Sequence, residues 1–574
     1  MIERPKEISV AEFFEKNKHI LGYSNPAKAL VTCVKEAVDN SLDACEEAGI
    51  LPDILVRINR VDKHYRITVE DNGPGIEKDE IPRIFGKLLY GSRFHTLKQS
   101  RGQQGIGISS AVLYAQLTTG KPTRVISKRR GESAWLYEIL IDTKRNEPEV
   151  VREEKIDWHR PHGIRIELEV EGSYVKGRRQ SVYEYLRQTS IINPHTRITF
   201  IEPDGEIHEF ERVSYELPKI PKAIKPHPHG IELGNLIKML KDSRARNLKE
   251  FLIKEFSRVG DKTAEEILRK SGLQNKHPRA VTREEAIKLL EAFKETQLLP
   301  PPTDCLSPIG GDLIIKSLVS EFKPEFVCAV SRKPKVYSGN PFLVEVGLAY
   351  GVNTDRTVLL RFANRIPLLY QQGGCALTKA VESVNWKSYG VQQNKNELPN
   401  APMVILIHIA STNIPYTSES KEAIAGIPEI VEEVRLALQE VGRKLKAYID
   451  KKRAIQEKRK KEGALLKIIP IIAKKCAEIL ERDEIDVSKV LARITGKVHI
   501  EKVVDSKIVK ITVSNFSRSK RKFKLYDSGK VWDLELKPFE EIVISYECEK
   551  PSTAKPLVDG LDPDLISGAE ILTF

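Results

Sequence analysis

Residues 100–110 read SRGQQGIGISS and lead directly into the apolar residues Ala111, Val112 and Leu113. Three glycines at the entry to a helix expose backbone N–H groups, and the N-terminus of a helix favours a phosphate. The segment is not a Walker A loop, because Gly-x-x-x-x-Gly-Lys-Ser/Thr occurs nowhere in the chain. It is not a dinucleotide-binding fingerprint either, since it lacks the preceding strand and the following acidic residue. The pattern therefore indicates a phosphate loop of another class.

Upstream of this loop, residues 25–49 are predicted to form a helix. Asn25 is a good N-cap, Pro26 suits the first helical position, and a glycine ends the segment. Its buried face is predicted to consist of Leu30, Val31, Val34, Ala37, Val38 and Leu42. One polar stripe carries Glu36, Asn40 and Asp43. A carboxylate and an amide one turn apart can activate water and ligate a hard cation, although a solvated polar face has the same spacing.

Residues 54–58 (ILVRI) and 65–69 (YRITV) alternate as a pair of strands and lead into EDNGPGI at 70–76. Gly73 and Gly75, on either side of a proline, fix a tight turn against which a flat base can lie. Asp71, at the strand end, can accept a hydrogen bond from an exocyclic amine. Taken alone, this is also common turn chemistry.

In this order, the three segments resemble the Bergerat ATP-binding fold of gyrase, heat-shock chaperones, mismatch-repair clamps and histidine kinases. The sequence is similar to that of the B subunits of archaeal DNA topoisomerase VI at KEAVDNSLDA (35–44), KLLYGSRFH (87–95) and RGQQGIGI (101–108). The resemblance continues through NPH (193–195), PHPHG (226–230) and SESKEAIA (418–425). It covers residues 1 to about 465 and is weaker in the tail.

The resemblance implies a role for each matching position. The general base for ATP hydrolysis falls on Glu36, the Mg²⁺ ligand on Asn40, and the adenine-contacting aspartate on Asp71, in the turn with Gly73 and Gly75. A nucleotide-contacting pair in the lid falls on Ser92 and Arg93. The phosphate loop falls on Arg101, Gly102, Gln103, Gln104, Gly105, Ile106, Gly107 and Ile108.

Two further positions carry implications of the same resemblance. Lys421 matches a lysine that reaches the γ-phosphate from a second domain and acts in catalysis. The chain departs from the pattern at Gly163-Ile164, where relatives often have Gly-Thr. Isoleucine in place of threonine removes a hydroxyl near the pocket for the nucleotide base, and only that contact is in question.

The chain is predicted to be an α+β protein of four domains. The resemblance implies a Bergerat-fold ATPase domain, an α/β sandwich, at 1–220, a helix-two-turns-helix insert at 221–300, and an α/β transducer with a long stalk helix at 301–463. A Pro/His-rich connector and the prolines at 300–302 mark the ends of the insert. Residues 464–574 are predicted to form another helix and a small, immunoglobulin-like β-sandwich, with strands near 508–513, 522–526 and 541–546.

Composition limits the class of protein. The net charge of +13 suits a polyanionic partner, and residues 221–280 hold 14 Lys/Arg against 7 Asp/Glu, although a solvated basic face has the same composition. The helix at 435–463 is similarly basic, with 11 against 4. Seven scattered cysteines favour a reducing cytoplasm over disulfides or zinc. The longest apolar runs are too short to span a membrane, and the charged N-terminus shows no secretory signal.

Two side-chain clusters look like metal ligands but are predicted to be structural. His227 and His229 lie in a proline-rich loop, where we expect them to cap backbone groups. Asp562 and Asp564 flank a proline near the C-terminus, where we expect a loop.

The resemblance implies the ATP-binding and ATP-hydrolysing subunit of a type II DNA topoisomerase. Mg-ATP would close two copies around duplex DNA, and a separate DNA-cleaving A subunit would complete an A2B2 heterotetramer and carry out strand passage. Two alternatives stay open from sequence: a mismatch-repair-like or chaperone-like ATPase clamp without a topoisomerase partner, and a DNA-binding structural protein that uses ATP only as a switch.

Overall fold

The computed structural model describes residues 8–19, 21–91, 97–102, 105–418, 420–481, 483 and 486–572. The chain forms two units, Met1–Lys446 and Ala447–Phe574. Within the described residues, no helix combines the length and the apolar character that a membrane crossing needs.

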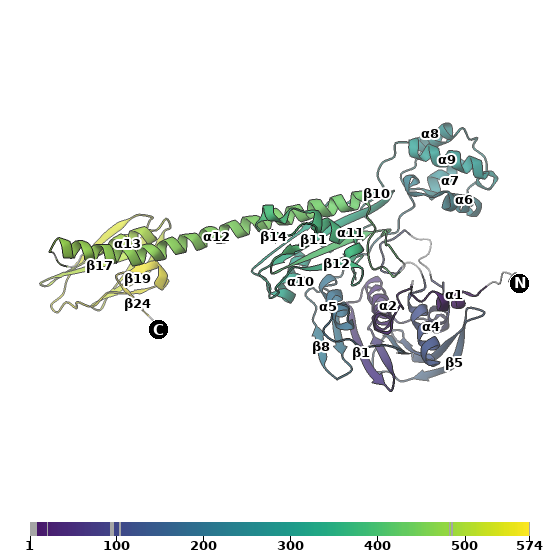
Figure 1. Cartoon of the computed structure of the whole chain (residues 1–574), viewed down its shortest axis with the longest axis horizontal. Helices are drawn as coiled ribbons and strands as arrows, with labels where there is room; N and C mark the ends of the chain where they lie inside the picture. Colours follow the sequence, from purple (N-terminus) through teal and green to yellow (C-terminus); the bar gives the residue numbers. More distant parts are fainter. Residues whose placement is uncertain are drawn as a thin grey trace. The chain divides into compact units, whose positions relative to one another are not determined.

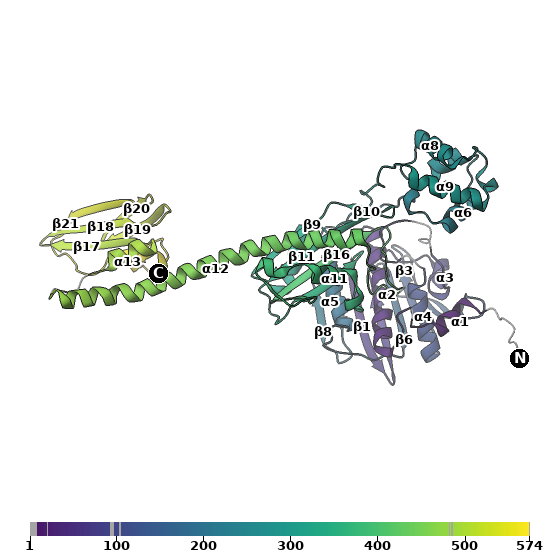
Figure 2. The ribbon, with the colours of Figure 1, turned by 45° about the horizontal axis from the view of Figure 1, so that its top comes forward.

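A mixed eight-stranded sheet, in the order β5-β4-β3-β6-β2-β1-β7-β8, organises residues 53–210 of the larger unit (Figure 1). Helices on one face of this sheet contact one another as well as the strands (Figure 2). The strands are β1 (Asp53–Val61), β2 (His64–Glu70), β3 (Thr123–Lys128), β4 (Ala134–Asp142), β5 (Glu147–Ile156), β6 (Gly163–Val170), β7 (Arg197–Ile201) and β8 (Ile207–Phe210). The helices are α1 (Val10–Lys16), α2 (Pro26–Glu47), α3 (Ile81–Gly86), α4 (Gly107–Thr119) and α5 (Val182–Ile192), of which α2, α3, α4 and α5 contact the sheet.

Helix α2 is the element that the sequence predicts best. The Asn25 side chain accepts a hydrogen bond from the Lys28 amide, and Pro26 is the first helical residue. All six predicted core residues of this helix are buried, so the predicted buried face is confirmed. The predicted strand pair is also confirmed, as β1 and β2 run antiparallel with Val56 opposite Val69.

Residues 228–295 form a helical insert with its own apolar core. It consists of α6 (Leu233–Asp242), α7 (Leu248–Glu255), α8 (Asp261–Ser271) and α9 (Arg283–Glu295). At its entry the His227 ring accepts a hydrogen bond from the His229 amide. The two imidazoles also donate to the carbonyl oxygens of Leu299 and Thr296, at 3.1 Å each. The capping role predicted for this histidine pair is therefore confirmed.

A second mixed sheet follows, in the order β10-β11-β16-β12-β13, with β9 also paired to β11. Its strands are β9 (Phe326–Ser331), β10 (Lys335–Tyr337), β11 (Asn340–Tyr350), β12 (Val358–Ala363), β13 (Ile366–Pro367) and β16 (Met403–Ser411), and a small hairpin adds β14 (Gln392–Gln393) and β15 (Pro399–Asn400). The helices α10 (Gly311–Phe322) and α11 (Ala376–Ser383) accompany it. The central strands β11 and β16 are almost entirely buried, as expected of strands covered on both faces.

Helix α12 (Pro428–Ile479) is a single helix of 52 residues. The predicted break near residue 464, with another helix after it, is therefore wrong. Gly463 and Pro470 both lie inside the helix. Each weakens one turn of a helix, by about 1 kcal/mol for glycine and about 3 kcal/mol for proline, but a helix this long keeps its hydrogen bonds on either side.

The smaller unit contains α13 (Ser488–Thr495) and two four-stranded sheets. The first sheet consists of β21 (Glu541–Glu547), β18 (Ile508–Asn515), β17 (Val498–Asp505) and β23 (Ile566–Ser567). The second consists of β20 (Lys530–Leu536), β19 (Arg521–Asp527), β22 (Leu557–Asp559) and β24 (Glu570–Ile571). Both sheets contribute to one apolar core, so the three strands predicted in the tail belong to a sandwich. The Asp562 side chain accepts a hydrogen bond from the Asp564 amide, which confirms the predicted loop role of this pair.

A buried polar pair lies at the centre of the second sheet. The Glu345 carboxylate accepts hydrogen bonds from the Ile309 and Gly310 amides, at 2.9 and 2.8 Å, and from the Ser331 hydroxyl. It also accepts from Nδ1 of His408, whose Nε2 accepts from the Arg365 amide. Burial alone would raise the pKa of Glu345, but the hydrogen bond from His408 and those from the backbone outweigh it and lower the pKa. Glu345 is therefore held as a carboxylate inside the sheet.

We expect Glu345→Ala to lower the free energy of unfolding by about 3–5 kcal/mol, because it leaves two amides and an imidazole unpaired in the core. Denaturant unfolding followed by circular dichroism measures this loss. The folded pKa of Glu345 is lowered, so its contribution is fully present above the unfolded value of about 4.3 and is lost as the pH falls through the folded pKa. The difference between wild type and variant should hold from pH 8 to 5 and shrink in stronger acid; a constant difference in acid would contradict the assignment.

Candidate functional site

A cavity of about 650 Å³ opens between the first sheet domain and the second. Its volume falls within the range typical of small-molecule sites. Helix α2, the turn after β2 and the N-terminus of α4 form most of its wall. Residues 367–370 and 420–422 of the second domain close the remaining side. The three segments that the sequence singled out therefore meet in one cavity.

Helix α2 contributes the polar stripe that the sequence predicted. Glu36, Asn40 and Asp43 all line the cavity, and Asn40 is exposed. Burial would raise the pKa of Glu36, but the ammonium groups of Lys35 and Lys421 outweigh it and hold the pKa below its ordinary value. The Glu36 carboxyl is therefore ionised at neutral pH and able to accept a proton. Its Oε1 lies 3.0 Å from the Lys35 ammonium.

Asp71 lines the cavity and is only 3% exposed. Its Oδ1 accepts hydrogen bonds from the Gly73 and Ile164 amides, at 2.9 and 3.1 Å, and its Oδ2 accepts from the Ser41 hydroxyl at 2.6 Å. These donors fix the orientation of a carboxylate that can accept a further hydrogen bond from a ligand amine. Ile164 lines the cavity, so this position offers an apolar contact and no hydroxyl.

Gly75 fixes the close packing of the turn that holds Asp71. It has a φ of +75°, and a Cβ added there would lie 2.3 Å from the Lys128 carbonyl oxygen. A side chain at this position would therefore both strain the backbone and collide with β3.

Helix α4 directs its first turn at the cavity. Gly105, Ile106, Gly107 and Ile108 all line the wall, and α4 begins at Gly107. The first amides of a helix have no partner within the helix, so they attract an anion. The Glu36 carboxylate already lies against this turn, because a Cβ added to Gly107 would be 2.1 Å from Glu36 Oε2. Glycine at 107 therefore leaves room for the carboxylate and for a phosphate beside it.

The Arg101 guanidinium is buried behind the cavity wall rather than lining it. It forms ion pairs with Asp43 and Glu46, at 2.7 Å each, and donates to the Asn193 side chain. Burial would lower the pKa of Arg101, but the Glu46 and Asp43 carboxylates raise it, so the cation is permanent. Any contribution of Arg101 to a ligand must therefore come through its main chain, while Gly102 lines the cavity itself.

Lys421 enters the cavity from the second domain. Its ammonium donates to the Arg101 carbonyl oxygen at 2.7 Å, although the two residues are 320 positions apart. Burial and the Lys35 ammonium lower the pKa of Lys421. A nearby anion would stabilise the charged ammonium and offset both effects, so the site favours a negatively charged ligand at this point.

Three charged residues around Lys421 were not found from the sequence. Lys35 contacts Glu36, Lys28 forms an ion pair with Glu422, and Lys28, Lys35 and Glu422 line the cavity together with Tyr370. The signal for Lys35 was present, because it precedes the predicted base on the same helix. The signal for Lys28 and Glu422 was absent, since it depends on tertiary packing between distant segments.

Four predicted ligand contacts, Ser92, Arg93, Gln103 and Gln104, lie outside the described residues. Their assignment stays a prediction from the resemblance.

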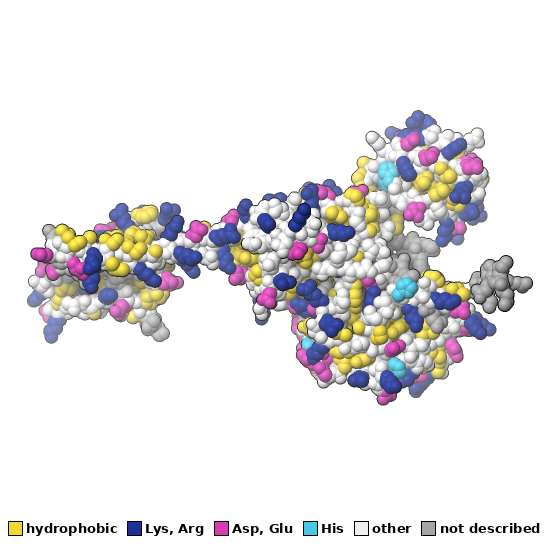
Figure 3. Space-filling view, in the orientation of Figure 1, with side chains coloured by type: hydrophobic (Ala, Val, Ile, Leu, Met, Phe, Trp, Pro, Cys, Tyr) yellow, Lys and Arg dark blue, Asp and Glu magenta, His cyan; other side chains and the backbone are white. Residues whose placement is uncertain are grey.

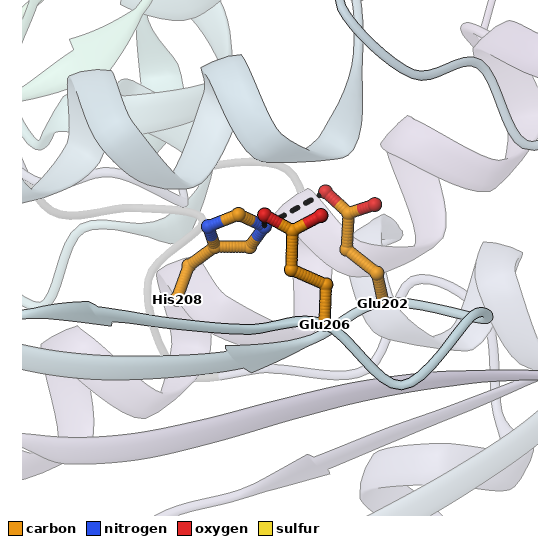
Figure 4. A group of neighbouring side chains, drawn as sticks. All are labelled: Glu202, Glu206 and His208. Atoms are coloured by element: carbon orange, nitrogen blue, oxygen red, sulfur yellow. Dashed lines mark hydrogen bonds and ion pairs between the residues drawn. The ribbon is translucent and has the colours of Figure 1, made fainter.

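One group of metal-type ligands occurs among the described residues, and it is not part of the cavity wall. Glu202, Glu206 and His208 direct their side chains toward one another on the β7–β8 hairpin (Figure 4). The Lys176 ammonium lies 2.9 Å from Glu202 and 2.5 Å from Glu206, and it also contacts Asp204. Because this ammonium already occupies the place of a cation, we interpret the group as an ion-pair cluster.

The chain matches two family models and is similar to two named relatives. Residues 301–461 match the family model described as "Topoisomerase VI B subunit, transducer", and residues 25–143 match "Histidine kinase-, DNA gyrase B-, and HSP90-like ATPase". The chain is 61% identical to the B subunit of type 2 DNA topoisomerase 6 from Archaeoglobus fulgidus, over 100% of both chains. The protein of the same name from Methanococcoides burtonii is 50% identical, over 100% of this chain and 98% of the relative.

Similarity to a solved structure is much weaker. The 43K ATPase domain of Thermus thermophilus gyrase B, in complex with an aminocoumarin, aligns with 16% identity and a TM-score of 0.37, over 80% of this chain and 98% of that one. This value is too low to support a conclusion.

We expect Gly107→Ala to reduce ATP turnover by roughly 10²-fold, because the methyl group displaces the Glu36 carboxylate and an error of about 1 Å in a reacting group has that effect. A steady-state phosphate-release assay measures it. Gly234→Ala in α6 is the matched control, since the added methyl group meets no described atom within 4 Å. Equal turnover in both variants would show that the space at Gly107 is not needed to position Glu36.

Proposed function

Because the chain belongs to the family of type 2 DNA topoisomerase 6 B subunits, we propose that it binds and hydrolyses ATP and that ATP binding closes two copies around duplex DNA. A separate DNA-cleaving subunit, in an A2B2 assembly, carries out strand cleavage and passage. Family membership also removes the mismatch-repair-like and chaperone-like alternatives.

The observation that best supports ATP-driven coupling is the hydrogen bond from Lys421 to the phosphate loop. A cation from the second domain there senses whether a γ-phosphate is present. Its attraction weakens once that group has left, and only such a difference in contacts lets a ligand shift a conformational equilibrium. Arg332, which directly follows β9, forms a 2.7 Å ion pair with Glu433 of α12. Movement of the second sheet can therefore be transmitted through this ion pair to the start of α12.

Each cavity residue has a separate role in ATP binding or hydrolysis. Asp71 accepts a hydrogen bond from the adenine amine, and the first turn of α4 receives the phosphates. Glu36 orients the attacking water and accepts its proton, while Lys421 stabilises the charge that develops on the γ-phosphate. This division accounts for one ionised carboxylate and one buried ammonium facing the same end of the cavity.

A magnesium ion fits the same end of the cavity. Mg²⁺ prefers oxygen ligands and usually takes only one or two from the protein, and the exposed Asn40 amide lies one turn from Glu36 on the same helix. When bound, the ion neutralises charge on the phosphate oxygens. Asn40 would hold it, and Glu36 would remain available to the water.

Surface charge supports a nucleic-acid partner. In Figure 3, Lys and Arg side chains gather along the middle of α12 and lie among acidic ones on the helical insert. In the insert, Arg244 and Arg246 are exposed, whereas the Lys249 ammonium already pairs with Asp261 and Glu265. The first two residues are therefore the better candidates for phosphate contacts.

The far part of α12 exposes an apolar surface. Several large apolar side chains are exposed there, and Figure 3 shows apolar atoms over α12 and α13. They are Leu465, Leu466, Ile468, Ile471, Ile472 and Ile479. Exposed apolar patches of this kind mark protein interfaces.

We expect Glu36→Ala to reduce hydrolysis by roughly 10²–10⁴-fold while nucleotide binding survives, because Asp71 and α4 are unchanged. Asn40→Ala should instead weaken Mg-dependent nucleotide binding. Turnover and binding of a fluorescent ATP analogue, with and without Mg²⁺, distinguish the two. Near-normal turnover in Glu36→Ala would rule out its role. Turnover in the wild type also separates this function from a structural protein that uses ATP only as a switch.

We expect DNA affinity to fall steeply with salt, since each phosphate contact releases counterions. Charge reversal at Arg244 and Arg246 should weaken binding to all sequences alike and reduce the salt slope by about one for each arginine that no longer reaches a phosphate. Lys249→Glu is the comparison, because its ammonium is already paired with carboxylates. Fluorescence anisotropy over a salt series measures this. Strong sequence dependence with little salt dependence would contradict phosphate tracking.

A further inference from the structure

Lys28 and Glu422 form a largely buried ion pair in the wall of the cavity that Lys421 also lines. Lys28 lies in the first turn of α2, and Glu422 follows Lys421 in the chain. The two side chains are 13% and 5% exposed. Tyr370 covers the pair, with its ring centre 5.0 Å from the Lys28 nitrogen, and burial together with Glu422 raises the pKa of Tyr370 to about 12. The pair is therefore largely withdrawn from water.

The backbone at Lys421 is held in an unfavourable conformation. Lys421 has a φ of +54°, in the left-handed region that side chains other than glycine seldom adopt. It lies near the tip of a hairpin, the Lys421 hairpin, which Tyr416 and Ile424 close at its base and a hydrogen bond from Thr417 to Ala423 supports. Strain of this kind persists only where surrounding contacts impose it, and it concentrates at functional sites.

Among the described residues of the Lys421 hairpin, a hydrogen bond and an ion pair connect Lys421 and Glu422 to the first domain. One is the hydrogen bond from Lys421 to the Arg101 carbonyl oxygen, and the other is the ion pair between Glu422 and Lys28. The first contact must break if the ammonium moves to a phosphate. The second uses neither the Lys421 ammonium nor the phosphate loop, so it can stay closed while the first one changes.

Resting on the proposed role of Lys421, we propose that the Lys28–Glu422 ion pair is a latch that positions Lys421 for the γ-phosphate. The latch fixes the Lys421 hairpin on α2, which also carries Glu36. The Glu36 carboxylate and the Lys421 ammonium are therefore both positioned by the same helix. Lys28 and Glu422 are positioning residues and touch neither the reacting phosphate nor the water. The same chain without the latch still holds the base and phosphates of a nucleotide but loses the cation at its γ end.

The charges around the cavity support a latch rather than a second phosphate ligand. Three lysines among the described residues line the cavity: Lys28, Lys35 and Lys421. Lys28 is paired with Glu422 and Lys35 with Glu36, whereas the hydrogen bond of Lys421 goes to a neutral carbonyl. An arriving phosphate recruits the Lys421 ammonium without separating an ion pair, while recruiting Lys28 would leave Glu422 as a buried, unpaired charge.

The test compares the affinities of the full-length chain for a non-hydrolysable ATP analogue and for ADP, by isothermal titration calorimetry. Only the first ligand has a γ-phosphate. Lys28→Met and Glu422→Gln should each reduce the preference for the ATP analogue over ADP by about tenfold, the effect of losing one charge-assisted hydrogen bond. ADP affinity itself should stay unchanged, and kcat should fall roughly 10- to 100-fold. A Lys28→Met/Glu422→Gln double variant should be no worse than the more affected single one, and Lys28→Arg should recover most of the preference that Lys28→Met removes.

A matched control tests whether any ion pair between the two domains would have the same effect. Arg187 of α5 and Glu321 of α10 form such a pair at 2.5 Å, and neither lines the cavity. Arg187→Met should leave the preference for the ATP analogue unchanged. An equal loss of preference in Arg187→Met and Lys28→Met would overturn the latch, because it would reduce the pair to general adhesion between domains.

Lys421→Ala separates failure of the latch from failure of the proposed function. If Lys421→Ala abolishes the preference and Lys28→Met and Glu422→Gln do not, the latch is wrong and the role of Lys421 stands. If Lys421→Ala keeps the preference, the proposed role of Lys421 is itself wrong. A thermal unfolding curve for each variant accompanies the binding data, and Glu422→Gln, which is nearly isosteric, decides the outcome if Lys28→Met does not fold.

Discussion

The buried guanidinium of Arg101 is the constraint on which the geometry of the cavity depends. It lies between Asp43 and Glu46 of α2 and the side chain of Asn193, and the arginine side chain itself is only 4% exposed. Removing one partner of a buried ion pair leaves an uncompensated charge, so Arg101 cannot leave α2 without a large loss of stability. The loop is therefore fixed at its first residue, and the Arg101 carbonyl is presented to Lys421.

The same anchor connects the two domains of the larger unit. Asn193, which accepts from Arg101, donates to the Arg365 carbonyl oxygen, and the Arg365 amide donates to His408. From there the hydrogen bonds pass to Glu345 and to the Ile309 and Gly310 amides, which directly precede α10. A continuous polar chain thus runs from Arg101 to the centre of the second sheet. Such a chain carries a coupling energy only if its members have two discrete arrangements that both sites favour differently.

Local patterns in the sequence predict the parts of the site that depend on short-range order. The cap and periodicity of α2 fix its buried face and hence its polar stripe, and the glycine turn fixes Asp71 at a strand end. Other features depend on long-range packing and were not predictable. Nothing local indicates that the Arg101 side chain turns away from the cavity, or that Lys28 pairs with a residue almost four hundred positions later. The continuity of α12 past Gly463 and Pro470 was not predicted. Glycine and proline indicate a helix end when only a short stretch of sequence is considered, but each disturbs only one turn of a long helix.

The ionisation of the cavity explains why an anion has a defined place in it. Glu36 is held as a carboxylate by Lys35 and Lys421, while partial burial and the Lys35 ammonium lower the pKa of Lys421. A cation in that position is electrostatically under-compensated, so bringing a phosphate close stabilises it more than it would stabilise an exposed lysine. Under the proposed function, the Lys421 hairpin belongs to the second domain, so that gain in stability would favour the arrangement in which the two domains meet. Ligand charge and domain position would thereby be linked through the Lys421 ammonium.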